Sequence, residues 1–311
     1  MGEVQVEKVL VTGGAGRLGR YVVAELARHC RVTVLDRDAH STVPVDRVVD
    51  VLDIAAVDGA MRGHDAVVHL AAIDSSVTAP PEAVFDTNVR GTWNVLHAAQ
   101  AAGVRKVVIC SSVAAAGLDY TNPGLAPLYL PIDEEHPLRP SQAYGLSKEI
   151  DEAIARSFGR RGGMEVTCLR PSWVLFPEAA RRIIAVQRGG ETAAGAGELT
   201  PPRPGRHREP LPVLRSWVAP EDAARAFRLA LARQPKPNAV FLITAAETFE
   251  PEPTLPYLER VYGGLPEVRK PEVYARNPSA SAFDISRARE ILGWSPSVSW
   301  AELSAGGAAG S

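Results

Sequence analysis

Residues 8–19 read KVLVTGGAGRLG, and this stretch decides the fold. A short apolar run, Val9–Val11, leads into glycines at positions 13, 14, 16 and 19, and a helix-forming segment, Arg20–His29, follows. The glycines fit both the G-x-G-x-x-G and the G-x-x-G-x-x-G spacing. Glycine at such positions permits a tight turn, close approach of a pyrophosphate to the backbone and close packing of helix on strand. The stretch therefore predicts a dinucleotide-binding strand–turn–helix unit, with the phosphates at the helix N-terminus.

An acidic residue at the end of the next apolar run bears on the choice of dinucleotide. Asp36 follows Gly16 by 20 residues and ends the run Val32–Leu35. A carboxylate there accepts hydrogen bonds from ribose hydroxyls and repels a 2′-phosphate. Arg17 and Arg37 each bring a guanidinium that could pair with a phosphate, although Arg37 could instead cover the adenine and Arg17 could neutralise the pyrophosphate. On balance the sequence favours NAD over NADP.

Apolar runs alternate with helical segments along the first two thirds of the chain. The expected strands are Val9–Thr12, Val32–Asp36, Arg47–Val51, Ala66–Leu70, Lys106–Ser111, Val166–Arg170 and Val240–Thr244. The expected helices are Gly16–His29, Ile54–Met61, Val84–Ala102, Gln142–Arg161 and Pro220–Arg233. Continuous apolar runs are typical of strands buried on both faces, so the alternation predicts an α/β fold with a Rossmann-type, doubly wound parallel sheet. Candidate polar and small residues lie at the carboxyl ends of these strands, where ligands bind in such folds: Gly13, Asp36, Asp53, Ala71 and Ser112.

The pattern weakens after residue 170, which indicates a second, smaller lobe. We expect residues 1–170 to form the dinucleotide-binding domain, with 216–244 returning to it, and 171–215 and 245–311 to form a C-terminal substrate-binding lobe. Residues 191–212 are rich in Gly, Pro and Arg and predict a mobile loop, whose Arg203 either meets an anionic substrate or is merely solvated. A short helix is expected over Phe283–Gly293.

Composition excludes several other classes of protein. The chain has 311 residues, 46% hydrophobic content and a formal net charge of −2, which gives no reason to expect nucleic-acid or membrane binding. No apolar run approaches the roughly 20 residues that span a bilayer, and the first residues do not resemble a signal peptide. Cys30, Cys110 and Cys168 are widely spaced within or beside apolar segments, as expected of a reducing compartment, and the histidines form no metal-binding pattern. The cytoplasm is the expected location.

The segment Tyr144-Gly-Leu-Ser-Lys148 carries the second informative pattern. Residues at i and i+4 share one face of a helix, which places the Lys148 ammonium one turn from the Tyr144 phenol. A phenol titrates near pH 10, and a neighbouring cation lowers its pKa toward the range useful for proton transfer. Ser112 lies 32 residues earlier at a strand end. Together with the glycine turn, these residues predict a catalytic proton-transfer site.

These motifs, in this order, resemble an extended short-chain dehydrogenase/reductase of the NAD-dependent epimerase/dehydratase family. The resemblance runs from about Lys8 to Trp300. The motifs that carry it are TGGAGRLG, VLDRD, VLD at 51–53, HLAA at 69–72, TNVRGTWNVL at 87–96, CSSVAAAG at 110–117, YGLSK, SWVAPEDAARAF and FDISRAREILGWSP.

The resemblance implies a role for each matched residue. Tyr144 exchanges a proton with a secondary alcohol, Ser112 binds the same oxygen, and Lys148 supports Tyr144 and the cofactor ribose. Asn88 is assigned to the cofactor region, where it either ties a helix to the sheet or contacts the ligands. The implied NAD-binding residues are Gly13, Gly16, Arg17, Leu18, Gly19, Asp36, Arg37, Asp53, Ala71, Ala72, Asn88, Ser111, Tyr144, Lys148 and Pro171. The implied substrate residues are Ser112, Trp173 and Arg203.

The sequence departs from the family's sugar-nucleotide epimerases after Arg170. Those proteins carry R-P-x-N-V-Y-G-P, whereas here Trp173 replaces the Asn and Phe176 replaces the Gly. The two aromatic residues either fill the core or shorten the substrate pocket. The substitutions favour a dehydrogenase acting on a free sugar, a uronate or a related cyclic alcohol over a nucleotide-sugar 4-epimerase. A non-catalytic dinucleotide sensor is the minor alternative, and a homodimer formed through the helices at 84–102 and 142–161 is implied by the resemblance alone.

Overall fold

A seven-stranded parallel sheet forms the centre of the computed structural model, which describes residues 6–39, 43–74, 79–118, 125–188, 213–233, 238–249 and 252–306. The strands of this sheet are β1 (Lys8–Thr12), β2 (Arg31–Asp36), β3 (Arg47–Val48), β4 (Ala66–His69), β5 (Lys106–Cys110), β7 (Glu165–Pro171) and β10 (Val240–Ile243). Their order across the sheet is β10-β7-β5-β4-β1-β2-β3, and every neighbouring pair is parallel. From β1 the chain first adds β2 and β3 on one side and then, from β4 onward, adds strands on the other side. The predicted doubly wound fold is therefore confirmed.

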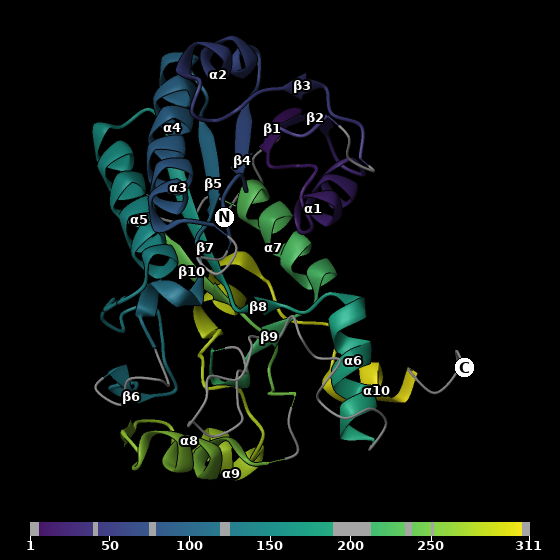
Figure 1. The fold of residues 1–311 in the computed structure, drawn as a ribbon, viewed down its shortest axis with the longest axis vertical. Coiled ribbons are helices and arrows are strands. Elements are labelled where there is room, and N and C mark those ends of the chain that lie inside the picture. The colour runs from purple at the N-terminus through teal and green to yellow at the C-terminus, as the bar shows by residue number, and fades with distance from the viewer. Residues whose placement is uncertain are drawn as a thin grey trace.

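Helices cover both faces of the sheet (Figure 1). One face carries α2 (Ile54–Met61), α4 (Gly91–Ala101) and α5 (Ala143–Arg161), and the other carries α1 (Gly19–Leu26) and α7 (Pro220–Ala232). Successive side chains of a strand point to opposite faces, and β1 follows this rule. Val9 and Val11 join the apolar cluster that contains the side chains of α1 and α7, whereas Leu10 joins the cluster of α2, α4 and α5. Continuous apolar strands are therefore required by burial on both sides.

Two predicted helices differ from the structure. The segment expected as one helix over residues 84–102 consists of α3 (Pro81–Phe85), a π-helical turn (Asp86–Arg90) and α4. The helix expected over Phe283–Gly293 is wrong in its first residues, because Phe283 forms a β-bridge with Ile132 and the π-helical segment spans only Ala288–Leu292. Phe283 is an apolar residue that the bridge buries in the core, so an apolar pattern alone did not distinguish it from a helical residue.

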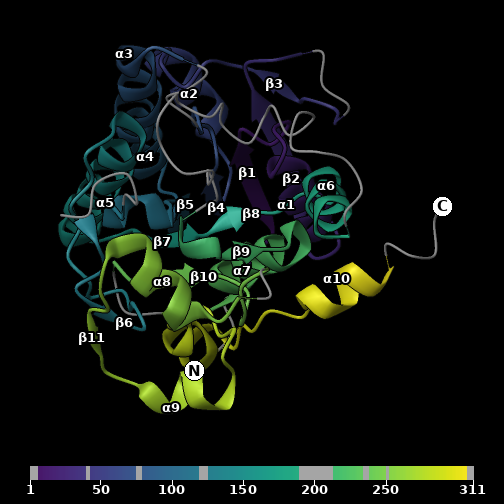
Figure 2. The same ribbon diagram turned by 60° about the horizontal axis from the view of Figure 1, so that its bottom comes forward.

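The remaining elements lie beyond the carboxyl ends of the strands (Figures 1 and 2). They are β6 (Tyr129–Leu130), β8 (Trp173–Val174), α6 (Pro177–Gln187), β9 (Trp217–Val218), α8 (Thr254–Tyr262), β11 (Glu267–Val268), α9 (Pro271–Arg276) and α10 (Trp300–Gly306). Two pairs of short parallel strands, β8–β9 and β6–β11, organise them. Among the described residues, no helix is both long and apolar enough to cross a membrane.

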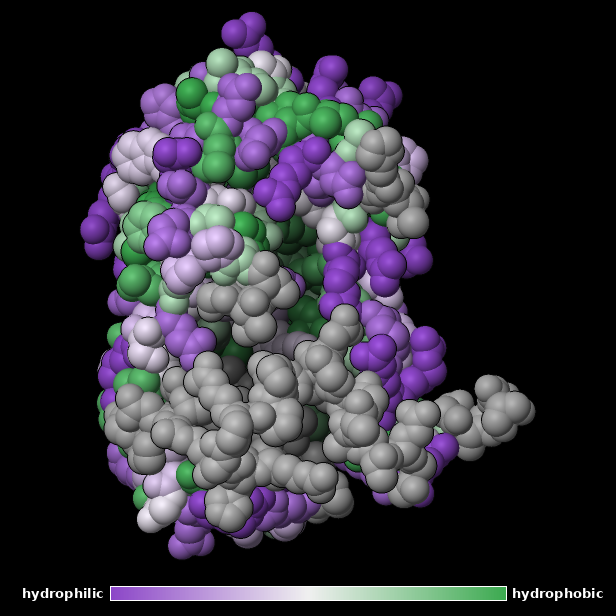
Figure 3. All heavy atoms as spheres, viewed as in Figure 1, coloured by the Kyte–Doolittle hydropathy of each residue, from purple (hydrophilic) through white to green (hydrophobic). Residues whose placement is uncertain are grey.

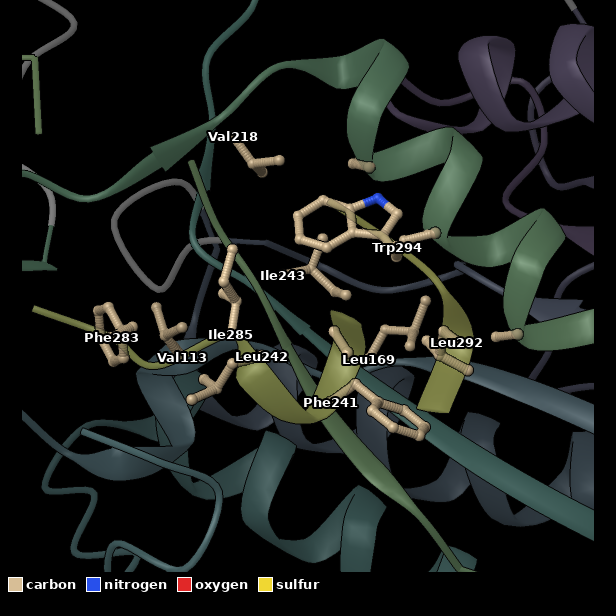
Figure 4. Close-up of a cluster of buried hydrophobic side chains, with 14 of the residues drawn as sticks. Val113, Leu169, Val218, Phe241, Leu242, Ile243, Phe283, Ile285, Leu292 and Trp294 are labelled. Atoms are coloured by element: carbon tan, nitrogen blue, oxygen red, sulfur yellow. The ribbon is translucent and has the colours of Figure 1, made fainter. Parts of the chain in front are cut away.

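The C-terminal segment is anchored in the main core rather than lying apart from it. Trp294 and Leu292 are fully buried beside Phe241 and Ile243 of β10 (Figure 4). The indole N–H of Trp294 donates a hydrogen bond to the carbonyl oxygen of Asp222 on α7, at 2.9 Å. The motif that contains Gly293-Trp294 therefore fixes this C-terminal segment against α7, which itself covers the sheet.

Candidate functional site

A pocket of about 670 Å³ opens at the carboxyl ends of the sheet strands. Figure 3 shows the face of Figure 1 hollowed near its middle, with apolar side chains visible inside the hollow. Most of the residues proposed from the sequence line this pocket: Gly13, Gly16, Arg17, Leu18, Gly19, Asp36, Arg37, Ala71, Ala72, Ser111, Ser112, Tyr144, Lys148, Pro171 and Trp173. Asp53 and Asn88 do not line it, and Arg203 lies outside the described residues. The loops after β1, β2, β4, β5 and β7 thus bring together segments from across the first 176 residues.

The glycine turn between β1 and α1 leaves no room for side chains. Gly13 has φ +69°, and a Cβ added there would lie 2.6 Å from the backbone nitrogen of Ala71. A Cβ at Gly19 would lie 2.2 Å from the carbonyl oxygen of Gly13. No side chain caps the N-terminus of α1, and its first turn holds no acidic residue. The loop is therefore a bare backbone cradle beside a helix N-terminus, which fits the pyrophosphate of a dinucleotide.

The carboxylate of Asp36 is held in place at the end of β2. Its Oδ2 accepts a hydrogen bond from the backbone N–H of Ala15 at 3.0 Å, and its Oδ1 accepts one from the N–H of Asp38 at 3.2 Å. Asp38 and Asp50 also line the pocket, together with Arg37. Negative charge at this position suits a ribose with free hydroxyls and opposes a 2′-phosphate.

Arg17 is engaged away from this acidic end. Its guanidinium contacts Glu178 of α6 at 2.5 Å and lies 4.2 Å above the ring of Phe176. Both partners belong to the segment that follows β7. Arg17 therefore links the glycine turn to the segment that follows β7, and both Arg17 and Phe176 line the pocket.

Two residues that the family resemblance assigns to cofactor binding make hydrogen bonds within the fold. Asp53 is the N-cap of α2, where its Oδ1 accepts a hydrogen bond from the N–H of Ala56 at 3.1 Å. Asn88 is fully buried in the π-helical turn and binds both the N–H and the carbonyl of Ile73, at 2.8 and 3.1 Å. Its amide also donates to the hydroxyl of Ser147 on α5, at 2.9 Å. Asn88 thus ties the loop after β4 to the helix that carries Tyr144.

Ser112, Tyr144 and Lys148 meet at one end of the pocket. Ser112 lies two residues past the end of β5 and caps the short 3₁₀ helix that follows, where its Oγ accepts a hydrogen bond from the N–H of Ala114 at 3.1 Å. The same hydroxyl lies close enough to Tyr144 to lower the pKa of its phenol. Tyr144 lies in the first turn of α5, with Lys148 one turn later. The Lys148 Nζ lies 5.8 Å from the centroid of the Tyr144 ring and donates to the carbonyl of Cys110 at 3.0 Å. The i, i+4 spacing therefore produces the predicted pair on one helix face.

The pKa of Tyr144 differs from the expectation in its net direction. Burial raises this pKa above its ordinary value, and this effect outweighs the lowering by the Lys148 charge and by the Ser112 hydrogen bond. The sequence predicted the contribution of Lys148 but not the burial. The phenol of the protein without cofactor is therefore protonated at neutral pH, and Lys148 limits how far burial raises its pKa.

Sequence reasoning missed three polar residues of this region. Asp74 lines the pocket, and its charge raises the pKa of Tyr144. Asp151 contacts Lys148 from α5, and Ser172 lines the pocket directly after β7. Asp74 and Ser172 stand just past strand ends, which is the signal that could have identified them. Asp151 gave no comparable signal, because an acid at i+3 from a lysine usually lies on a solvated helix face.

Trp173 both lines the pocket and packs against other aromatic residues. Its ring lies 6.0 Å from that of Phe249 in an edge-to-face arrangement, and Phe249 lies 5.8 Å from Trp300 of α10. Phe176 is buried and lines the pocket below Arg17. Trp173 and Phe176 therefore both pack against neighbouring side chains and line the pocket, so the two residues fill space in the fold and also narrow the pocket.

Comparisons with known proteins agree with this geometry. Residues 9–243 match the model of the NAD dependent epimerase/dehydratase family. The chain is 35% identical over 182 residues to L-arabinose 1-dehydrogenase (NAD(P)(+)) of Haloferax volcanii, covering 56% of this chain and 70% of that protein. It is 29% identical over 322 residues to UDP-glucose 4-epimerase of Lactobacillus helveticus, covering 93% and 92% of the two chains.

Solved structures show the same relationship. A short-chain dehydrogenase/reductase superfamily protein from Agrobacterium tumefaciens with bound NAD superposes with a TM-score of 0.70 at 28% identity, covering 97% of this chain and 96% of that chain. The fold, the family match and the cradle for a dinucleotide point to the same conclusion. The chain belongs to the NAD-dependent epimerase/dehydratase family and is an NAD-dependent enzyme of the short-chain dehydrogenase/reductase type.

Proposed function

We propose that the protein oxidises or reduces a secondary alcohol or ketone carbon of a sugar-like substrate, with Tyr144 as acid/base. The observation that carries this proposal is the meeting of Ser112, Tyr144 and Lys148 in the pocket that begins at the glycine turn. NAD, when bound, exchanges a hydride at its nicotinamide ring with the substrate carbon. Tyr144 takes or returns the hydroxyl proton, and Ser112 stabilises the negative charge that develops on the same oxygen.

A net dehydrogenase is the preferred form of this activity. Trp173 occupies the position of the epimerases' asparagine and is fixed by Phe249, so the pocket loses a polar partner and gains a rigid wall. This supports a free sugar or cyclic alcohol over a nucleotide-linked sugar. Asp74 adds negative charge beside Tyr144, which favours a neutral, hydroxyl-rich substrate over a uronate. A nucleotide-sugar 4-epimerase is the second candidate, supported by the similarity to UDP-glucose 4-epimerase over 93% of the chain.

The purified protein, mixed with NAD and a panel of sugars, tests this proposal through the absorbance of NADH. The panel contains neutral aldoses, the matching uronates and the matching nucleotide-linked sugars. We expect steady NADH formation with a neutral free sugar and less with its uronate. Formation of a new nucleotide-sugar isomer without net NADH would instead establish the epimerase.

The fixed carboxylate of Asp36 leads to a prediction about cofactor preference. Replacing it by alanine removes the charge that opposes a 2′-phosphate and leaves Arg37 free of that neighbour. We expect Asp36→Ala to raise the ratio of NADP to NAD efficiency by about tenfold or more, since one like-charge contact is worth on the order of 1–2 kcal/mol near a surface. The measurement is kcat/KM with each cofactor. An unchanged ratio would place Asp36 away from the ribose.

The wider organisation is also part of the proposal. The lobe of residues 171–215 and 245–311 supplies the substrate side of the pocket, supported by the lining residues Ser172, Trp173 and Phe176. We further propose a cytoplasmic homodimer that forms through α4 and α5, because Trp93 and Leu146 are large apolar side chains exposed on these helices. The molar mass in solution tests the dimer, and a monomeric mass would refute it.

A further inference from the structure

A buried acid next to the catalytic pair is not explained by the roles assigned so far. Asp151 lies one helical turn after Lys148 on α5, and its Oδ2 is 3.2 Å from the Lys148 Nζ. The side chain of Asp151 is fully buried and that of Lys148 is 5% exposed. Because charged groups are rarely buried without a functional or structural reason, this pair calls for one.

We propose that Asp151 is a positioning residue of the reaction, whose carboxylate is the counter-ion that keeps the Lys148 ammonium charged and directed at Tyr144. The proposal rests on the proposed function, in which Lys148 acts on Tyr144. Three contacts fix the ammonium: the Cys110 carbonyl at 3.0 Å, the Asp151 carboxylate at 3.2 Å and the Tyr144 ring, whose centroid is 5.8 Å away. Without Asp151, the Cys110 carbonyl would be the only hydrogen-bond partner left to this buried cation among the residues that the structure describes.

The electrostatics of Lys148 support this role. Burial alone would lower the pKa of the ammonium, but the Asp151 carboxylate, followed by Tyr144 and Cys110, raises it above its ordinary value. Burial also raises the pKa of Asp151 above its ordinary value, and the Lys148 charge offsets part of that rise. Each charge thus compensates for much of the desolvation cost of the other, as a buried pair requires.

The neighbouring acid cannot replace Asp151. Glu152 accepts two hydrogen bonds from the guanidinium of Arg170, at 2.7 and 2.8 Å, and one from the hydroxyl of Ser111 at 2.6 Å. Two consecutive buried acids of α5 therefore have separate partners. Glu152 is paired with the cation of β7, and Asp151 is paired with Lys148.

The histidine, threonine and cysteine side chains around the pair are neutral. His69 at the end of β4 lies between the hydroxyls of Thr12 and Thr92, at 2.7 and 3.0 Å. Burial, together with the Lys148 charge, lowers the pKa of His69 to about 3. The Thr92 hydroxyl also lowers the pKa of Asp151, and burial raises the pKa of Cys110 to about 11, so this thiol is uncharged as well. Beyond these groups, Glu152 faces Asp151, and Ser112 and Asp74 face Tyr144.

This arrangement has a measurable consequence for Tyr144. Removing the Asp151 charge leaves burial free to lower the pKa of the Lys148 ammonium, and a Lys148 that is neutral or displaced no longer lowers the pKa of the Tyr144 phenol. The cation lies 5.8 Å from the centroid of the Tyr144 ring, and at an effective dielectric constant of about 20 its loss raises the midpoint of the phenol titration by about one to two pH units. A purely structural residue would change stability or turnover without moving this titration.

Asp151→Asn tests the proposal by two readouts. The first is the pH dependence of kcat for alcohol oxidation. The second is the ultraviolet titration of the Tyr144 phenolate without cofactor, taken as the difference from the matching protein that also carries Tyr144→Phe. We expect both midpoints to rise by about one to two pH units, because the phenol loses the cation that lowers its pKa. Glu149→Gln, which removes an acid from the same helix beside Lys148, should leave both midpoints unchanged, and Asp151→Glu should restore the wild-type midpoints.

Unchanged midpoints in Asp151→Asn would overturn the proposal, whatever the loss of turnover. An equal shift in Glu149→Gln would overturn it too, because the effect would then be a general response to charge. If Asp151→Asn does not fold, Asp151→Ser removes the same charge with less bulk and takes its place in both measurements. A wild-type protein that transfers no hydride to any sugar would refute the proposed function, while the phenolate titration would still decide the role of Asp151.

Discussion

Tyr144→Phe is expected to lower turnover by at least about 10²-fold, the usual scale for losing a positioned acid/base. The ring of Tyr144 keeps its place in the first turn of α5 after this change, and only the hydroxyl that Ser112 contacts is lost. The proposed binding site for the nicotinamide cofactor is formed mainly by the glycine turn and by Asp36, which this substitution leaves untouched. We therefore expect the Kd for NAD to stay within about twofold of the wild-type value, since the hydroxyl contributes little to uniform binding.

The measurement pairs steady-state kinetics with a titration of NAD binding by tryptophan fluorescence. The matched control is Tyr21→Phe on α1, which removes the same hydroxyl group elsewhere. Tyr21 contacts Phe176 and Arg20 but does not line the pocket. This control should keep both turnover and NAD affinity. A parallel loss of turnover and of NAD affinity in Tyr144→Phe would assign Tyr144 a structural role instead.

The sequence predicted the central sheet well because the residues of each strand indicate it without reference to distant segments. The strands are short apolar runs that end in glycine or polar residues, and burial on both faces forces them to be continuous. The glycine turn was predicted equally well from its spacing, and the structure shows the reason: a Cβ at Gly13 or Gly19 would overlap backbone atoms. The pair Tyr144 and Lys148 follows from helix geometry alone.

The parts that were missed depend on contacts between distant segments. Phe283 was expected in a helix, but it forms a β-bridge with Ile132, which lies 151 residues earlier in the sequence. Asp53 is a local exception: it stands beside a candidate strand end, yet its carboxylate caps α2 through Ala56, while Asp50 and Val51 line the pocket. The net pKa of Tyr144 was missed because it depends on distant segments. Burial arises from the packing of the whole site, whereas the spacing of Lys148 shows only one of the charges involved.

Lys148→Met is expected to cost about 3–5 kcal/mol of unfolding free energy as well as activity, because it leaves the fully buried Asp151 carboxylate without its cation. The loss depends on pH. An unpaired buried carboxyl has a folded-state pKa above its unfolded value of about 3.9, so the native state takes up a proton there. The cost is therefore absent in acid below the unfolded pKa and grows as the pH rises toward the raised folded pKa. Denaturant unfolding of both proteins across acidic to neutral pH measures this difference.

The double variant Lys148→Met/Asp151→Asn separates stability from catalysis. It removes both charges, and replacing both partners of a buried ion pair by neutral groups is often close to neutral for stability. We therefore expect it to regain most of the unfolding free energy that the single variant loses, with no pH-dependent deficit, while turnover stays low because Tyr144 still lacks its cation. A double variant as unstable as Lys148→Met would mean that the loss comes from the ammonium's hydrogen bond to the Cys110 carbonyl rather than from an unpaired Asp151 carboxylate. Recovery of stability without recovery of turnover would show that the two buried charges are retained for the chemistry at Tyr144, since the fold does not need them.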